Sequence, residues 1–548
     1  MLFSHKISFS KTSFESKFTQ VSEQKSFFAQ LQKIFIKDKY KFNYLPIFSP
    51  MGDAKVAREI YHGKFNFSGL TLDTNGLSPF MIHINKDYIF GQIHNFSWLS
   101  HMYAAKSAIS LAASRTFILD WIKIFGNKTN SHSYDYEITT NRIVNWLIHS
   151  NWLLKQSSTD FQQAFIDSIK EQAYHLYKNF IIIKDKYTKL HVAITLLLAC
   201  RFTNLPLKFN QRILKIFTQA TQENILLDGG HISLEPQKIY NILSLLIPIK
   251  QSYLQLLEQP PAILIEMIER LFPCLRFFTH TNGELAHFHG STIVTKQAIN
   301  ACLSHDETNG AIFQHAPYSN FYRLANNNNI LIANVGINNS ESAMSFEFSS
   351  QQQRIIVNCN ESCVKLIPNQ YKSDKFSNLH HSYLQNEKLL FTKQRLKAIT
   401  QNISLEKLSN QNKLGFCASH VKKYKHNIKI IHQREIFLDT DDTITGSDKL
   451  TYENLKGAIP STKISFHLHP DIIVKKRLCN FLLIGKNNNV WEFSCDNAIL
   501  KLDESIYHCP THGALPSKKI ILTFNNIPSS IINWKICRIK ESLLQFDG

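Results

Sequence analysis

The apolar residues of this 548-residue chain change their spacing beyond its middle, and this change constrains the fold more than any other feature. From Ser97 to Ala301 they recur at helical spacing, as in "TFILDWIKIF" and "LHVAITLLLACRF". After about Pro317 the chain turns to short alternating runs such as "QRIIVNCN" and "KIILTFNNI", which are typical of strands. The sequence therefore predicts helical hairpins, in a solenoid or a ring, followed by an antiparallel β-sandwich.

The length of the chain favours an α+β multidomain protein, because 548 residues are too many for one ordinary core. We expect a mixed segment over residues 1–90, a helical domain over residues 91–310 and a sandwich over residues 311–548. No strict repeat of 34 or 40 residues is visible in the helical part, which counts against the common solenoids.

The composition gives a formal charge of +19 and a pI near 9.3, and this balance favours acidic partners. Nucleic acid, an anionic membrane surface and an acidic polysaccharide all meet that condition, as does the plain alternative of a generally basic proteome. The chain lacks the phosphate-binding glycine loops, the H-E-x-x-H zinc motif and the G-x-S-x-G elbow. Nucleotide chemistry and zinc proteolysis are therefore not expected.

The ten cysteines and the chain start bear on the compartment. No cysteine falls in the first 199 residues, and the closest pair, Cys359 and Cys363, has no matching second pair, so free buried thiols are expected. The first 20 residues lack the apolar core and cleavage site of a secretory signal. The longest apolar runs fall far below the roughly 20 residues that cross a bilayer. The sequence by itself reads as soluble and, by default, cytoplasmic.

The stretch "ILLDGGHISLEPQKIY", residues 225–240, places an acid, two glycines, a histidine, a glutamate and a proline within nine positions. A plain turn between two helices needs far fewer special residues. We call residues 225–240 the corner segment, and the sequence leaves open whether it is a structural corner or the floor of a catalytic site.

Several stretches in one order carry a resemblance to a known family. They are "AREIYHGKFNFSG", "IHNFSWLSHMYAA", "RIVNWLIHSNWLL", "LLDGGHISLEP", "APYSNFYRLANNNNILIANVG", "MSFEFSSQQQRIIVNCN", "HHSYL", "ASHVKKYKHNIKIIHQREIFL" and "ITGSDKL". Together they resemble the heparinase II/III-like family, in particular its bacterial branch, from roughly Phe48 to about Arg538. The resemblance implies an incomplete (α/α) toroid of helical hairpins that leads into an antiparallel β-sandwich.

The resemblance also implies an activity, since characterised members are cell-envelope polysaccharide lyases that cleave uronate-containing glycans by β-elimination. That reaction needs a group that neutralises the uronate carboxylate, a base for the carbon-bound proton and an acid for the departing oxygen. "LHHSYL" places His381 on the family's catalytic histidine, and "CASHVKKY" places His420 on a second histidine that lines the site. Arg323 matches a family arginine, and its guanidinium is suited to bidentate hydrogen bonds with a carboxylate; a buried structural partner is the alternative.

The helical half departs from the family pattern. Lys238 stands where the lyases have a tyrosine, and Tyr240 lies two residues further on. Tyr187 lies near the position of an expected upstream Asn or His, and His231 follows the two glycines of the corner segment. We therefore predict His381, His420 and Tyr240 as catalytic residues, and His231, Arg323, Lys238 and Tyr187 as substrate-binding residues.

No metal ligand or cofactor is predicted. The resemblance leaves room for a divalent structural ion, but Asn334 stands where many relatives carry Asp, and no spacing of ligands supports such an ion.

The leading hypothesis is a lyase that binds an acidic polysaccharide, and no nucleic acid, in a cleft between toroid and sandwich. The alternative is a catalytically silent glycan-binding or envelope-assembly protein with the same fold. The resemblance points to the cell envelope or periplasm, whereas the chain start points to the cytoplasm.

Overall fold

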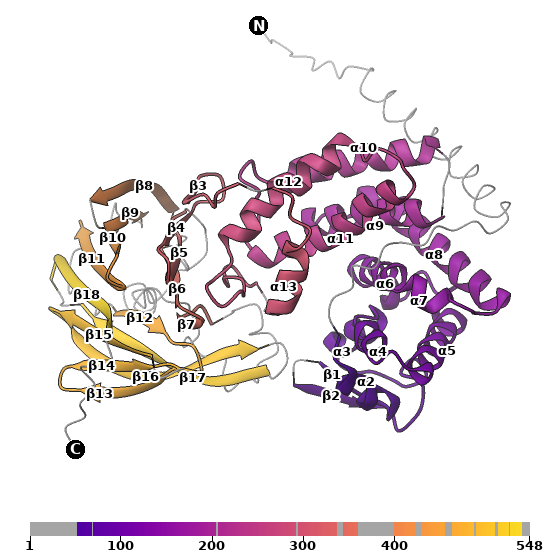
Figure 1. Cartoon of the computed structure of the whole chain (residues 1–548), viewed down its shortest axis with the longest axis horizontal. Coiled ribbons are helices and arrows are strands. Elements are labelled where there is room, and N and C mark those ends of the chain that lie inside the picture. Colours follow the sequence, from indigo (N-terminus) through magenta and orange to yellow (C-terminus); the bar gives the residue numbers. More distant parts are fainter. Residues whose placement is uncertain are drawn as a thin grey trace, which may run out of the picture.

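The computed structural model describes residues 52–539, apart from position 68 and the segments 204–206, 292–293, 309, 337–343, 360–398, 411–412, 424–428, 455–462, 487–488, 510–512 and 525–526. Within these residues a helical half is followed by a half made of antiparallel sheets, and the two lie side by side (Figure 1). The change from helices to strands falls between Leu303 and His315.

The described part of the helical half contains twelve α-helices. They are α2 (Ala54–Tyr61), α3 (Asp87–His94), α4 (Leu99–Ala104), α5 (Ala108–Phe125), α6 (Tyr136–Ile148), α7 (Ser150–Leu154), α8 (Thr159–Asn179), α9 (Lys186–Thr203), α10 (Leu207–Asn224), α11 (Pro236–Gln255), α12 (Ala262–Phe277) and α13 (Lys296–Leu303). A small hairpin of β1 (Lys64–Phe67) and β2 (Leu70–Asp73) follows α2.

Local chemistry fixes where several of these helices begin. The Ser107 side chain accepts from the backbone N–H of Ser110, and a reciprocal bond completes a capping box at α5. The side chain of Asp185 accepts from both the backbone N–H and the hydroxyl of Thr188, at 2.7 and 2.8 Å, at the start of α9. Pro236 occupies the first turn of α11, where no backbone N–H is needed.

Helix α9 is the centre of the helical half. Its sequence is apolar nearly all round, and twelve of its eighteen residues are buried. It packs against α6, α8, α10 and α11, so its apolar residues find partners on every side. The part of α9 from Leu190 to Thr203 therefore has a fixed position relative to the helices around it.

The sheets contain the remaining strands. They are β3 (His315–Ala316), β4 (Phe321–Ala325), β5 (Asn329–Asn334), β6 (Phe346–Ser350), β7 (Gln353–Ile356), β8 (Ile399–Asn410), β9 (Lys413–Lys423), β10 (Lys429–Asp439), β11 (Thr443–Glu453), β12 (Lys463–His467), β13 (Ile473–Arg477), β14 (Asn480–Ile484), β15 (Val490–Asp496), β16 (Ile499–Cys509), β17 (Gly513–Thr523) and β18 (Ser529–Ile539).

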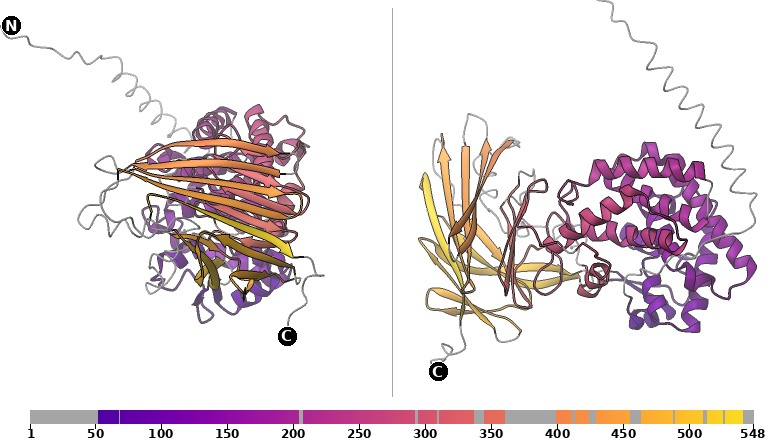
Figure 2. Two further views of the ribbon diagram at one scale, coloured as in Figure 1. Left: turned by 90° about the vertical axis from the view of Figure 1, so that its left-hand side faces the viewer. Right: turned by 45° about the horizontal axis from the view of Figure 1, so that its top comes forward.

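These strands form a two-layer sandwich. One layer is an eight-stranded sheet in the order β13-β14-β15-β18-β11-β10-β9-β8, which we call the long sheet. The other layer joins β3-β4-β5-β6-β7 to β12-β17-β16, because the backbone of Val357 bonds to His467 and that of His469 bonds to Ile355, both at 3.0 Å. The second layer lies between the long sheet and the helices (Figure 2).

The strands of the long sheet alternate in burial, as the sequence pattern predicts. In β10 and β11 every second residue is buried between the layers. Asp448 is one of these residues, and it accepts from Arg434 Nε at 2.6 Å, from Trp534 Nε1 at 2.8 Å and lies 2.7 Å from His432 Nε2. A buried carboxylate with this many donors is fully satisfied, so the apolar sandwich core tolerates it.

The predicted fold class, a helical toroid followed by an antiparallel sandwich, is confirmed by this architecture. Among the described residues, none of the helices has both the length and the apolar character needed to span a membrane.

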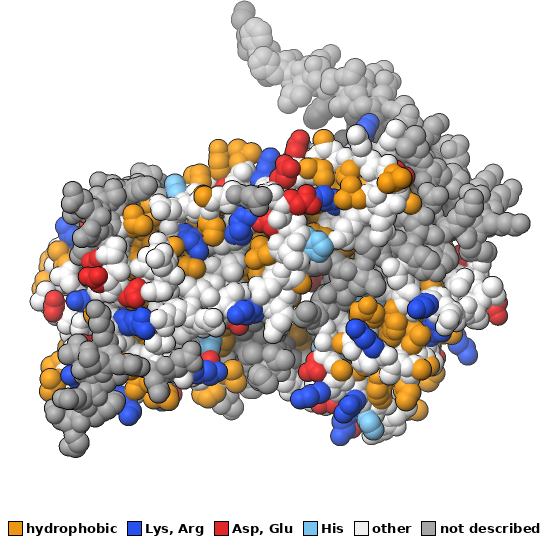
Figure 3. Space-filling model, viewed as in Figure 1, with side chains coloured by type: hydrophobic (Ala, Val, Ile, Leu, Met, Phe, Trp, Pro, Cys, Tyr) orange, Lys and Arg blue, Asp and Glu red, His pale blue; other side chains and the backbone are white. Residues whose placement is uncertain are grey.

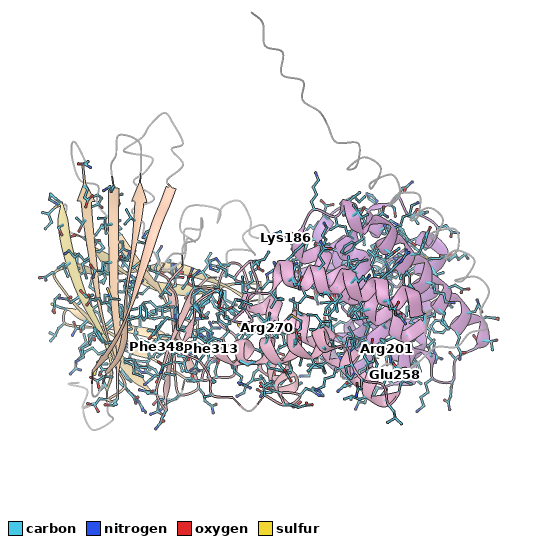
Figure 4. The ribbon with its side chains drawn as sticks, turned by 90° about the horizontal axis from the view of Figure 1, so that it is seen from above. Lys186, Arg201, Glu258, Arg270, Phe313 and Phe348 are labelled. Carbon is cyan, nitrogen blue, oxygen red and sulfur yellow. The ribbon has the colours of Figure 1, made fainter. Side chains whose placement is uncertain are left out.

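The corner segment joins the two halves. Asp228 Oδ2 accepts from the backbone N–H of Tyr318 at 2.9 Å, and from the backbone N–H and hydroxyl of Ser319 at 2.7 and 2.9 Å. Its Oδ1 accepts from the backbone N–H of Gly230 at 3.0 Å. Gly229 has φ +83°, and a Cβ added there would lie 2.2 Å from the carbonyl oxygen of Arg270 in α12. Figure 4 labels Arg270 near the sheets, whereas Arg201 and Glu258 lie farther from them.

We expect Gly229→Ala to destabilise the protein by about 3 kcal/mol or more, because the new Cβ adds a backbone clash to an unfavourable φ. Gly76 is the matched control, since it has φ +78° with no heavy atom within 4 Å of an added Cβ. Gly76→Ala should cost only about 1 kcal/mol. Urea unfolding of both variants measures the difference, and equal losses would contradict the clash.

Candidate functional site

The first turn of α9 and the corner segment bring three predicted substrate-binding residues together. The rings of Tyr187 and His231 are 5.3 Å apart and perpendicular. Lys238 Nζ lies 4.4 Å from the centroid of the Tyr187 ring and 2.7 Å from Glu235 Oε1. The Asn241 amide nitrogen is 3.5 Å from the Tyr187 hydroxyl. Tyr187 and Lys238 are partly exposed, so this cluster has access to solvent.

Burial sets the protonation of this cluster. It raises the pKa of Tyr187 to about 12, so the hydroxyl keeps its proton at neutral pH. Burial, helped by the positive charge of Lys238, lowers the pKa of His231 to about 3, so its imidazole is neutral. The pKa of neither group therefore lies near pH 7, where that of an efficient general base is expected.

The tautomer of His231 follows from its neighbour. The backbone N–H of Ser233 donates to His231 Nδ1 at 3.0 Å, so Nδ1 is an acceptor and the proton of the neutral ring is on Nε2. His231 is only 2% exposed, and Nε2 has no hydrogen-bond partner among the described residues. The ring therefore packs against Tyr187 and holds its orientation.

The segment 287–291 lies beside this cluster. The backbone N–H of Gln237 reaches the Ser291 hydroxyl at 3.4 Å. Two residues earlier, His289 has φ +52°, and burial lowers its pKa to about 4. Its Nε2 lies 3.1 Å from the amide nitrogen of Asn334 in β5. His289 was not predicted as a site residue, although "HTNGELAHFHG" carries three histidines in eleven residues.

These residues do not fit the divalent ion that the family resemblance leaves room for. Asn334 Oδ1 accepts from the backbone N–H of Gly336 at 3.2 Å, which fixes the amide so that its nitrogen donates to His289 Nε2. Both amide atoms and one ring nitrogen are thus engaged. Within the described parts of the chain, no group of three or more His, Cys, Asp or Glu side chains has the arrangement of a metal site.

A buried polar group, which we call the junction network, ties the helical half to β6 and β7. Glu347 lies 3.1 Å from His280 Nε2, accepts from the backbone N–H of His287 at 3.0 Å and pairs with Arg354. Asn358 donates its backbone N–H to the same carboxylate at 2.8 Å. Burial alone would raise the pKa of Glu347, but Arg354 and His280 lower it to about 2.

The other predicted site residues lie elsewhere. Tyr240 is 7% exposed in the helical core, and burial raises its pKa above the usual value. Arg323 donates from Nε to the carbonyl oxygen of Phe277 at 3.1 Å, at the end of α12. His420 lies between the sandwich layers with its ring 6.5 Å from that of His432. His381 lies outside the described residues, and the roles predicted for all four stay predictions.

Comparisons with known proteins were made for the whole chain. Residues 308–535 match the family model for the heparinase II/III-like C-terminal domain, so the resemblance to that family is confirmed. FtsZ-localized protein C of Caulobacter vibrioides is 24% identical over 514 residues, which are 87% of this chain and 88% of that protein.

Solved structures share the fold. A crystal structure of heparinase III has a TM-score of 0.66 at 14% identity, covering 96% of this chain and 91% of that one. A mutant of the heparan sulfate lyase HepC from Pedobacter heparinus has a TM-score of 0.55 at 14% identity, covering 94% and 88%. The likeness extends over both halves of the molecule.

The buried neutral histidines make stability depend on pH. His287 has its pKa lowered to about 3 by burial and by the nearby Arg354, whereas an unfolded histidine titrates near 6.5. Its contribution to stability is therefore complete above pH 6.5 and is lost as the pH falls toward 3. We expect His287→Gln to make the fall in unfolding free energy between pH 5.5 and 4.5 shallower by about 1.4 kcal/mol per pH unit.

Urea unfolding at a series of pH values measures this slope. Gly76→Ala, which loses no histidine, should keep the slope of the wild type. A His287→Gln slope equal to that of the wild type would contradict the prediction.

Proposed function

We propose that this chain, whose residues 308–535 form a heparinase II/III-like C-terminal domain, is a lyase that cleaves an acidic, uronate-containing polysaccharide of the cell envelope by β-elimination. The observation that carries the proposal is the position of Lys238 Nζ, 4.4 Å from the centroid of the Tyr187 ring. The fold shared with heparinase III supports it.

The two side chains have complementary roles in this reaction. The ammonium of Lys238 binds the uronate carboxylate and withdraws charge from the neighbouring carbon, which makes its proton easier to remove. The hydroxyl of Tyr187 donates a proton to the departing glycosidic oxygen, because its high pKa keeps it protonated until that oxygen becomes basic. His231 orients the Tyr187 ring, and Glu235 holds the Lys238 ammonium near it.

A separate base must remove the carbon-bound proton. Tyr187 keeps its own proton, and the acceptor nitrogen of His231, Nδ1, is already occupied by the backbone N–H of Ser233. We assign the base to His381, which the family resemblance places on the catalytic histidine. The side chain of His420 is buried in the sandwich interior, so it would influence the reaction only through residues that pack against it.

A comparison of two tyrosines tests the acid. Purified protein is incubated with uronate polymers, and the unsaturated product is followed by its absorbance. Tyr187→Phe should lower kcat by about 10²- to 10⁴-fold with little change in KM, because only the hydroxyl is lost. Tyr240→Phe removes a hydroxyl from the helical core and should lower kcat far less. The opposite order would transfer the role to Tyr240.

The carboxylate role of Lys238 has its own test. Lys238→Met keeps the length of the side chain and removes the charge, so KM for a uronate polymer should rise about tenfold, as for loss of one charge-assisted contact. Lys250→Met is the control, because that lysine pairs with Glu307 at 2.8 Å away from the corner segment. An unchanged KM for Lys238→Met would contradict the role.

A second function is favoured by one observation, the 24% identity to FtsZ-localized protein C over 87% of this chain. In this alternative the chain binds an envelope glycan, localised with FtsZ as the relative's name says of that protein, without cleaving it. On the face seen in Figure 3, Lys and Arg side chains are interspersed with Asp and Glu, which does not indicate a surface for nucleic acid.

Binding and cleavage separate the two functions. Saturable binding of a uronate polymer without unsaturated product, across a broad panel, would support the silent protein and overturn the lyase. A fluorescent fusion that gathers together with FtsZ, in a protein that forms no product, would support the alternative.

A further inference from the structure

The face of the long sheet that points away from the helices is hollowed. The hollow has a volume of about 370 Å³ and is open to solvent. It lies over β10, β11, β18 and β15, which are seen face-on in Figure 2, left. We call it the outer hollow. Its position, beyond the second sandwich layer, separates it from the cluster around Tyr187.

A row of polar side chains crosses the four strands of the outer hollow. Glu435 pairs with Ser447, Ser447 with Asn533 and Asn533 with Asp496. Neighbouring strands are about 4.8 Å apart, so the row spans about 14 Å between its two carboxylates. This length fits an extended chain of several units, and it exceeds what a single ion or small metabolite needs.

The neighbouring row supplies an aromatic surface. Phe437 pairs across the strands with Gly415 on β9 and with Thr445 on β11. A Cβ added to Gly415 would lie 2.4 Å from the Phe437 ring, so the missing side chain is what lets this ring lie against the backbone of β9. Phe437 stays partly exposed in this position. An aromatic ring laid on a sheet presents a negative face to C–H and N–H groups of a sugar.

The charge of the outer hollow differs from that of the whole chain. Its two carboxylates, Glu435 and Asp496, face one ammonium, Lys535, although the chain carries +19. The ion pairs of the described residues do not include any of these three side chains, and the amide of Gln433 donates to Glu435 at 3.3 Å. A local excess of negative charge disfavours a polyanion and favours a ligand with cationic groups.

We propose that the outer hollow binds an oligosaccharide of amino sugars with free amines, separately from the cluster around Tyr187. The ring of Phe437 stacks on one sugar, and Glu435 and Asp496 bind ammonium groups at the two ends of the row. Ser447 and Asn533 hydrogen-bond to hydroxyls between them. The site thus takes a basic glycan, whereas the cluster around Tyr187 and Lys238 takes an acidic one.

The test uses the full chain and a hexamer of glucosamine, with the N-acetylated hexamer as the uncharged comparison. Calorimetric titration should show saturable binding of the glucosamine hexamer and about tenfold weaker binding of the acetylated one. Phe437→Ala should weaken binding of both by about fivefold, because stacking does not depend on the amine. The double variant Glu435→Gln/Asp496→Asn should remove the preference for the free amine.

Lys449→Ala is the matched control, since this exposed residue of β11 lies on the same face outside the outer hollow. It should bind the glucosamine hexamer as the wild type does. Failure of the wild type to bind the glucosamine hexamer, or equal binding of both hexamers, would overturn the proposal. Cleavage of uronate polymers should be unchanged by Phe437→Ala, so the outcome here is separate from that of the lyase assay.

Discussion

The carboxylate of Asp228 is the interaction on which the arrangement of the two halves depends. It accepts three hydrogen bonds from Tyr318 and Ser319, which lie between β3 and β4, and a fourth from the backbone N–H of Gly230 in its own turn. Gly229 lets the chain approach α12 closely enough for these bonds to form. The corner segment is therefore a structural joint, and the cluster of Tyr187, His231 and Lys238 is built on that joint.

The two carboxylates buried on either side of the joint share one feature, which is that each accepts hydrogen bonds from several fixed donors. Glu347 has Arg354, His280 and two backbone N–H groups, and Asp448 has Arg434, Trp534 and His432. Such networks add little net stability over apolar packing, but losing one member leaves a buried charge unpaired. These networks favour one position of the sheets relative to the helices over all others.

The fold was predictable from the sequence because helical and strand periods are local properties, and the site was predictable only in part. Lys238 and Tyr187 were predicted as site residues from family positions, and the structure places their side chains together. Tyr240 lies two residues after Lys238, and 200° of helical rotation turns it into the core. The histidine partners of Glu347 lie 60 and 67 residues from it, and Asn334 lies 45 residues from His289, and no local pattern reveals such pairs.

Helix α9 has a consequence for how the molecule meets a glycan. Helix α9 packs against four other helices, and Asp185 caps its first turn through Thr188. Both contacts restrain the position of Tyr187. Under the proposed function, a polymer that binds beside Tyr187 therefore meets side chains with a constant spacing. If the proposal holds, we expect any adjustment to a longer or more branched chain to come from the polymer itself or from the sheets.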